Sequence, residues 1–271
     1  MLTILNSISS LNAENALSST QANLQKSLTQ LSSGLKINSG SDDAAGLSIA
    51  NGLQANIAAL TQSSSNASDG IGALQTADGA MSQVTTLLNR AVTLATEASN
   101  GGLSTAQSTA LDTEYQSILT EITNISGTTN FNGTAVFGST PAVYETDGST
   151  GGSTTLANSA ITAVDAKTLG LTGDLKSSAD AIKELSNITA AIATVAADRG
   201  AVGASVNQLS ASQNVENTEV TNLQSAVNDI QNADVGKTVA NMTQYNVLQQ
   251  TGMAALSQSN QAQQSVLKLL Q

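Results

Sequence analysis

The chain has 271 residues and a net charge of −11, with 11% charged and 2% aromatic residues and no His, Cys or Trp. These absences exclude disulfide bonds, cysteine nucleophiles, histidine bases and Cys/His zinc sites. The acidity argues against a nucleic acid or an anionic membrane as a partner, and no apolar run reaches the ~18 residues that a bilayer span needs.

Charge is distributed unevenly along the chain. Residues 1 to 40 and 235 to 271 together hold one acid and four bases, whereas residues 41 to 234 hold nineteen acids and five bases. Two nearly uncharged ends therefore flank an acidic middle. Low charge is also typical of disordered polar tails, and that alternative stays open for an isolated copy of the chain.

The first predicted element is a helix near the N-terminus. Its apolar stripe is spaced by seven, four, three and four residues: Leu17, Leu24, Leu28, Leu31 and Leu35. Gly34 and Gly40 then weaken the helical pattern. Ser41 offers a hydroxyl for the N-cap, and Asp42 and Asp43 offer carboxylates for the first turn, so a second helix is predicted to begin here.

The second predicted helix is long, because apolar residues recur in a four-three register from residue 53 to residue 95. Polar residues such as Asp78 interrupt this register. The sequence Asn-Gly-Gly at 100–102 ends the helix. Ser104 can cap a third helix, whose stripe runs from residue 111 to residue 125.

Helical periodicity disappears between residues 127 and 173, where Phe131-Asn132-Gly133 and residues 142–152 indicate short strands and turns. It returns near Ser178 and continues to residue 230. This second long helix matches the first in length, at roughly 80 Å each, so antiparallel pairing is predicted. A last apolar stripe begins at Val235 and continues toward the C-terminus.

The predicted fold is mainly α, with long antiparallel coiled-coil helices and a small β-hairpin region at about residues 128–173. Seams sustained over so many heptads are typical of coiled coils. Narrow helices cannot hide all these aliphatic side chains within one chain, so repeated contacts between copies are predicted. The assembly seams are Leu17, Leu24, Leu28, Leu31, Leu35, Val235, Val239, Met242, Leu248, Leu256, Leu267 and Leu270.

Candidate chemical sites are weak. The sequence Gly-Lys-Thr at 236–238 resembles the end of a phosphate loop, but Gln231 stands where that loop needs Gly. Asp42-Asp43 is not followed by calcium-loop spacing. Gly200 and Gly203 are expected to let two helices pack closely, and Glu216 with Glu219 is expected on a solvated helix face. We therefore predict no catalytic, cofactor or metal site and no enzymatic activity.

Arg90 interrupts a long stretch without positive charge, between Lys36 and Lys167. The simpler interpretation is a solvated side chain that balances Glu97 or Glu114. The alternative is an exposed recognition residue.

Several motifs, in order along nearly the whole chain, resemble bacterial flagellins. They are LSSGLKINS at 31–39 with DDAAG at 42–46, NASDGI at 66–71, FNG at 131–133, LQQ at 248–250, NQ at 260–261 and VLKLL at 266–270. The resemblance implies a subunit that self-assembles into the flagellar filament for swimming motility. It also implies an inner terminal-helix domain at 1–40 and 235–271, a helical domain at 41–234 and no large outer domain.

The resemblance further implies partners and a location. A flagellin is exported unfolded through the flagellar type III apparatus, is guarded by an export chaperone at its C-terminal end, and joins an extracellular filament bounded by cap and hook-junction proteins. In flagellins that Toll-like receptor 5 recognises, an Arg, a Leu and a Glu make key contacts. They correspond to Arg90, Leu94 and Glu114, although Val92 and Thr93 stand where charged residues are common.

Two alternatives to a filament subunit stay open. A hook-filament junction protein would be similar at both ends but present in few copies. A secreted helical translocator or pore former belongs to a different class, and it lacks support because the chain has no long apolar hairpin.

Overall fold

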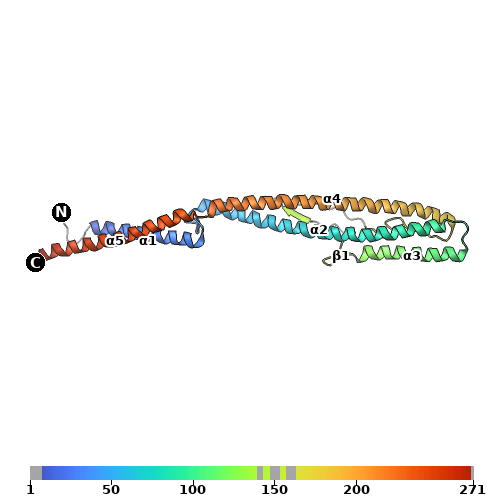
Figure 1. Ribbon diagram of the computed structural model, residues 1–271, viewed down its shortest axis with the longest axis horizontal. Coiled ribbons are helices and arrows are strands. Elements are labelled where there is room, and N and C mark those ends of the chain that lie inside the picture. Colours follow the sequence, from blue (N-terminus) through green and yellow to red (C-terminus); the bar gives the residue numbers. More distant parts are fainter. Residues whose placement is uncertain (1–7, 139–142, 147–152, 157–162, 270–271) are drawn as a thin grey trace. The chain divides into compact units, whose positions relative to one another are not determined.

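The computed structural model describes residues 8–138, 143–146, 153–156 and 163–269. The helices are α1 (Ile8–Ser33), α2 (Ala44–Ala98), α3 (Thr105–Thr128), α4 (Ser178–Gln231) and α5 (Val235–Leu269). The short strands are β1 (Asn130–Phe131), β2 (Thr134–Ala135), β3 (Val143–Thr146) and β4 (Ser153–Leu156), paired as two antiparallel hairpins. The mainly helical fold with a small β-hairpin region confirms the prediction (Figure 1).

The chain divides into two compact units. We call residues 1–55 and 222–271 the terminal unit and residues 56–221 the central unit. These limits fall within α2 and α4. The domain boundaries predicted at 40/41 and 234/235 fall instead between helices, and the division into an inner and a helical domain stays a prediction.

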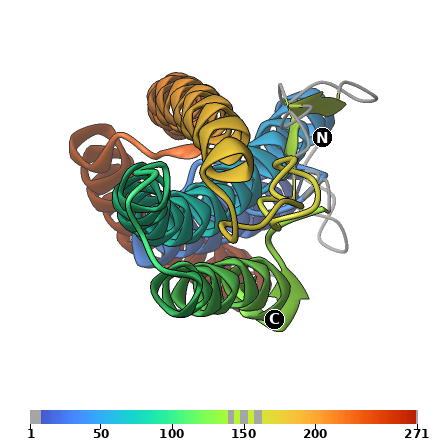
Figure 2. The same ribbon diagram turned by 90° about the vertical axis from the view of Figure 1, so that its right-hand side faces the viewer.

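The central unit is built on antiparallel pairing of α2 and α4, as the matched helix lengths predict. Ser63 early in α2 bonds to Glu216 late in α4, while Asp78 further along α2 binds Arg199 earlier in α4. The guanidinium of Arg199 donates to both carboxylate oxygens of Asp78, at 2.7 and 3.2 Å. The view along the helices shows α3 lying beside α2 (Figure 2).

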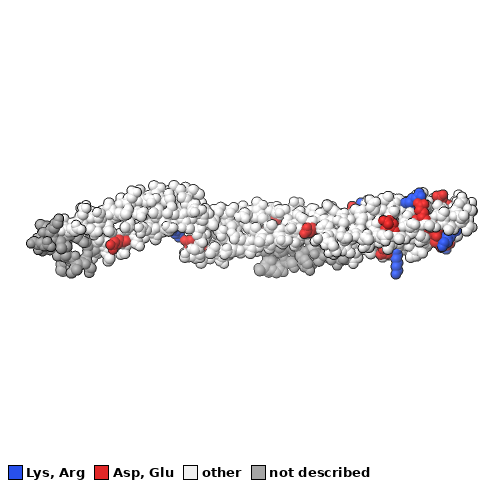
Figure 3. All heavy atoms as spheres, turned by 90° about the horizontal axis from the view of Figure 1, so that it is seen from below, with Lys and Arg blue, Asp and Glu red and all other residues white. Residues whose placement is uncertain are grey.

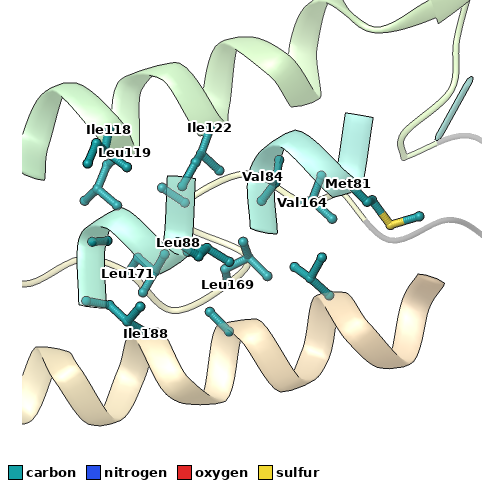
Figure 4. Packing of buried hydrophobic residues seen from close by; sticks show 14 of the residues in the cluster. Met81, Val84, Leu88, Ile118, Leu119, Ile122, Val164, Leu169, Leu171 and Ile188 are labelled. Atoms are coloured by element: carbon teal, nitrogen blue, oxygen red, sulfur yellow. The ribbon is translucent and has the colours of Figure 1, made fainter. Parts of the chain in front are cut away.

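The core of the central unit is aliphatic and fully covered. Leu74, Met81 and Leu88 on α2 and Ile122 on α3 are at most 1% exposed. The segment 163–175, which has no helix or strand, adds side chains to the same cluster. Figure 4 shows Val164, Leu169 and Leu171 of this segment among the side chains of α2, α3 and α4. Three helices and this segment thus enclose one core.

The predicted helix starts are partly right. Ser104 caps α3, and it forms a capping box with Gln107, as the sequence indicates. At α2, however, Ser41 is not the cap. The Oδ1 atom of Asp43 accepts from the Gly46 backbone N–H at 2.9 Å, so Asp43 occupies the N-cap position. The hydroxyl of Ser41 instead contacts that of Ser39.

The first hairpin forms at the Asn-Gly pair that predicts it. Asn132 and Gly133 both have positive φ, 49° and 78°, as a tight hairpin turn requires. The glycine prediction at Gly200 and Gly203 is wrong, because a Cβ at either position would meet nothing within 4 Å. The close approach lies at Gly70, where a Cβ would overlap the Val143 side chain.

The terminal unit contains the antiparallel pair α1 and α5. Backbone hydrogen bonds join the segment that follows α1 to the segment between α4 and α5. Lys36 N–H donates to the Gln231 carbonyl at 2.7 Å, and Ala233 N–H donates to the Gly34 carbonyl at 2.9 Å. Further along, Leu17 of α1 packs against α5 at Gly252. Among the described residues α1 packs against α5, and the loop after α1 also contacts α1, at Lys26 and Gln30.

Candidate assembly surface

Large apolar side chains are exposed along α1 and α5. On α1 these are Ile8 (73%), Leu11 (59%) and Leu28 (42%), and on α5 they are Val235 (56%), Val239 (38%), Val247 (54%), Leu248 (44%) and Met253 (49%). We call these eight side chains the apolar surface. Several large apolar side chains exposed on one helix pair are typical of a surface that another protein covers.

The predicted seam residues lie on or beside this surface. Leu28, Val235, Val239 and Leu248 are exposed. The side chains of intermediate exposure are Leu17, Leu24, Leu31, Leu35, Met242 and Leu256. Leu270 and the side chain of Leu267 lie outside the described residues. None of the ten described seam side chains is buried, so one copy leaves the seam incomplete.

Sequence reasoning missed part of the surface. Ile8 and Leu11 precede the predicted stripe, and Val247 and Met253 lie off the predicted face of α5. The stripe pattern selects one face of a helix that is covered on one side. Exposure on several sides of α5 is what an isolated helix pair produces, and a count of apolar residues around the whole helix could have indicated it.

A shallow groove of about 500 Å³ lies between α1 and α5. Its lining residues are Leu17, Met253, Leu256, Ser257, Asn260, Gln261 and Gln264. The groove is mixed apolar and amide in character and contains no charged side chain. It extends the apolar surface rather than forming an enclosed ligand site.

The loop between α1 and α2 is fixed by a carboxylate. Asp42 pairs with Lys26 of α1 at 2.8 Å and accepts backbone N–H bonds from Asn38 and Ser39 at 3.1 Å. The bond from Lys26, the Asn38 N–H and the Ser39 hydroxyl lower the pKa of Asp42 to about 2. The Asp42-Asp43 pair therefore has structural roles, in the loop and in the cap of α2.

In the central unit, the structure brings two of the three receptor-contact candidates together. The guanidinium of Arg90 contacts Oε1 of Glu114 at 2.7 and 2.8 Å, and both side chains are about half exposed. Arg90 thus balances Glu114, as the simpler interpretation predicts. Leu94 is fully buried in the core. It is therefore not part of an exposed contact patch with the other two.

Charged side chains of the central unit gather where α2 ends, α3 runs and α4 begins, as one face of the molecule shows (Figure 3). The sequence places Arg90, Glu97 and Glu114 there, together with charged residues between 165 and 184. Ion pairs such as Lys183 with Asp180 at 3.5 Å belong to this region. Exposed pairs of this kind contribute little to stability.

The sequence reasoning missed the burial of three carboxylates, those of Asp112, Glu184 and Glu216. Glu184 is 2% exposed and accepts bonds from the Tyr115 hydroxyl at 2.6 Å and from Asn187 at 2.8 Å. Burial and the nearby Glu184 raise the pKa of Tyr115 well above its ordinary value. Glu216 is 5% exposed and accepts from the Ser63 hydroxyl, so the prediction that it lies on a solvated face is wrong.

The buried face of α4 was only partly predicted. Ile188, Val195 and Leu209 of the predicted apolar stripe are buried, whereas Ile182, its first member, is 58% exposed. Ala181, Glu184 and Ala191, which are not in the stripe, complete the buried face. Because this face includes alanines and a glutamate, the periodicity of large apolar residues does not reveal it.

The described residues contain no group of three or more acidic side chains placed to hold a metal ion. Among them, no helix is both long enough and apolar enough to cross a bilayer. The fold and the apolar surface together define a mainly helical protein whose terminal helices leave large apolar side chains exposed.

Comparisons with known proteins identify the family. The N-terminal helical region of bacterial flagellin matches residues 4–141, and its C-terminal helical region matches residues 185–270. Flagellin of Halalkalibacterium halodurans is 36% identical, over 91% of this chain and 91% of its own length. Flagellin of Escherichia coli O127:H6 is 36% identical over 78% of this chain but only 41% of its own length.

A solved structure, the crystal structure of Bacillus cereus flagellin, is 31% identical, with a TM-score of 0.48 over 56% of this chain and 88% of that chain. The chain belongs to the bacterial flagellin family. It is a structural subunit of the flagellar filament, and the comparisons do not favour a hook-filament junction protein or a pore former.

Proposed function

We propose that the chain polymerises by burying the apolar surface of α1 and α5 against other copies of itself. The observation that carries this proposal is the location of the exposed apolar side chains. Of the eleven large apolar side chains exposed among the described residues, nine belong to the terminal unit. The central unit, by comparison, leaves only Ile182 and Val215 exposed.

The energetics favour many weak contacts over one strong one. Full burial of an aliphatic side chain contributes about 1.5–3 kcal/mol, so a side chain already half covered contributes about 1 kcal/mol more. Association costs ~4–15 kcal/mol in lost freedom. Several side chains of the apolar surface must therefore be covered together, which couples ordering of the ends to assembly.

Limited proteolysis tests this coupling. We expect α1 and α5 to be cleaved quickly in the monomer and slowly in the filament, while the central unit resists in both. Electron microscopy of the same samples confirms which contains filaments. Terminal helices as resistant in the monomer as in the filament would contradict coupled ordering, and a concentrated, seeded sample that stays monomeric would contradict polymerisation itself.

In the proposed filament, residues 1–40 and 235–271 form the inner domain and residues 41–234 face outward. The charge distribution supports this arrangement, since the middle segment holds nineteen of the twenty acids. Outward carboxylates repel one another through water, so filament stability should depend on salt and pH. No enzymatic activity is part of the proposal.

Family membership also supports a route to the filament. We propose that the chain leaves the cell through the flagellar type III apparatus with an export chaperone on α5, and that cap and hook-junction proteins bound the filament outside the cell. Pull-down with the chaperone of the same bacterium tests the first contact. A variant with the apolar side chains of α5 replaced by Ser should lose that binding.

Recognition by Toll-like receptor 5 is a separate proposal. It rests on the exposed Arg90–Glu114 pair and is weakened by the burial of Leu94. A reporter-cell assay with purified monomer tests it. Signalling that falls in Arg90→Ala and is unchanged in the exposed control Lys183→Ala would support it, and no response to the unaltered monomer would reject it.

A further inference from the structure

Two charges on α1 and α5 have no ion-pair partner among the described residues. Glu14 is the single acid in the sequence of these two helices, and it is exposed. Lys237, at the start of α5, is also exposed. The other described bases of the terminal unit are engaged, since Lys26 binds Asp42 and Lys36 donates to the Asp229 carbonyl.

Both charges stand among side chains of the apolar surface. Leu11 lies one turn before Glu14 on α1 and is 59% exposed. Val235 and Val239, 56% and 38% exposed, flank Lys237. Covering this surface removes water from Glu14 and Lys237 as well. A desolvated charge without a partner is strongly unfavourable, so assembly must supply each with an opposite charge.

The two charges cannot meet within one copy. Leu17 packs at Gly252, and α1 and α5 run antiparallel, so Glu14 lies level with residue 255 of its own chain. Lys237 lies 18 residues before that position, near the start of α5. At ~1.5 Å per residue the two positions are roughly 27 Å apart along the helix axis, far beyond the reach of an ion pair.

We propose that Glu14 of one copy pairs with Lys237 of a neighbouring copy, and that this contact sets the axial offset between them. Neighbours that point in the same direction and are shifted by ~27 Å bring these side chains level. This inference rests on the proposed polymerisation and adds to it a partner residue and a register. Apolar contacts slide easily, whereas one desolvated pair selects a single offset.

Charge reversal provides the test, with the critical concentration for seeded polymerisation as the readout. We expect Glu14→Lys and Lys237→Glu each to raise it by at least ~10-fold, because like charges then face each other. The double variant should return to within ~3-fold of the unaltered chain. Equal critical concentrations for all four proteins would overturn the pairing while leaving polymerisation intact.

Mixing the two single variants distinguishes loss of the ion pair from a folding defect in either variant. Glu14→Lys and Lys237→Glu monomers carry opposite changes, so unlike copies attract where like copies repel. An equimolar mixture should polymerise at a total concentration at which neither variant does alone. The inference would be overturned if the mixture polymerised no better than either variant alone. It would also be overturned if Lys268→Glu, rather than Lys237→Glu, restored the polymerisation of Glu14→Lys.

Because the chain has no Cys, cross-linking adds a geometric check. Oxidised filaments of the double variant Glu14→Cys/Lys237→Cys should yield a ladder of covalent oligomers, and the matched variant Glu14→Cys/Lys268→Cys should not. A ladder only in the matched variant would assign the contact elsewhere. Failure of the unaltered chain to form filaments would instead contradict the proposed function.

Discussion

The central and terminal units are both rich in aliphatic residues but differ in how far these are buried. In the central unit α2 and α4 are joined by α3 and by segment 163–175, and core side chains such as Leu88 have no exposure. In the terminal unit α1 packs mainly against α5, and Leu248 is 44% exposed. The additional covering elements of the central unit therefore distinguish its buried core from a helix pair that leaves apolar side chains exposed.

The largest effect should come from matched leucine truncations in the two units. Leu88→Ala removes a fully buried side chain and should cost ~2–5 kcal/mol of monomer stability. Leu248→Ala should cost less than about 1 kcal/mol in the monomer, because the side chain is already half in water. Urea denaturation of the monomer measures both.

The same pair should behave differently in polymerisation. Leu248→Ala should raise the critical concentration, whereas monomers of Leu88→Ala that remain folded should polymerise as the unaltered chain does. Equal monomer destabilisation by the two truncations would remove the distinction between the units.

A smaller effect is expected from the buried hydroxyl in the central unit. Tyr115→Phe removes the bond to Glu184 and leaves that carboxylate with Asn187 as its side-chain donor. We expect a loss of about 1–3 kcal/mol, since a buried acceptor is left partly unsatisfied. Thermal unfolding by circular dichroism measures this loss. A change below the error would show that water replaces the hydroxyl.

Replacing a glycine inside α4 by alanine should increase the stability of the monomer. Gly200 lies inside the helix with open space around its Cβ position. Gly200→Ala should therefore stabilise the monomer by roughly 0.5–1 kcal/mol through helix propensity alone. Gly70→Ala, which overlaps Val143, is the matched control and should destabilise. A destabilising Gly200→Ala would restore the close-packing interpretation.

The smallest effect should be pH-dependent and confined to the terminal unit. The lowered pKa of Asp42, about 2, means that its ionised form is bound more favourably in the folded chain. Its contribution is present above the ordinary pKa of about 4 and is lost as the pH falls to about 2. The difference in unfolding free energy between the unaltered chain and Asp42→Asn should therefore fall to zero as the pH is lowered from about 4 to about 2.

Glu14→Gln serves as the control for this titration, because Glu14 has no ion-pair partner among the described residues of its own copy. Its stability difference from the unaltered chain should stay near zero at every pH. A gap for Asp42→Asn that is independent of pH would indicate a packing effect rather than a charge effect.

Much of the fold could be predicted because helix periodicity and turn chemistry are local. The break near residues 34–43, the cap at Ser104 and the Asn132-Gly133 hairpin are confirmed. The choice of cap at α2 was wrong because Ser41 and Asp43 both have capping side chains. Only the observed path of the loop, with Asp42 bound to Lys26, decides between them.

The faces of the helices were harder to predict. Glu184 lies on the buried face of α4 because Tyr115, far away in sequence, supplies a hydrogen bond. Ile182 is exposed although it fits the predicted stripe. Tertiary partners of this kind leave no local signal. The apolar surface could be predicted in general terms, because its exposure follows from too few covering helices.

The second hairpin has a consequence for protein engineering. Thr146 at the end of β3 pairs with Ser153 at the start of β4, so the chain leaves and re-enters this hairpin at one point. Downstream, Leu175 N–H is anchored by Asp112 at 2.9 Å, independently of the hairpin. A foreign domain with adjacent termini, inserted between these strands, is therefore expected to leave the path of the core unchanged.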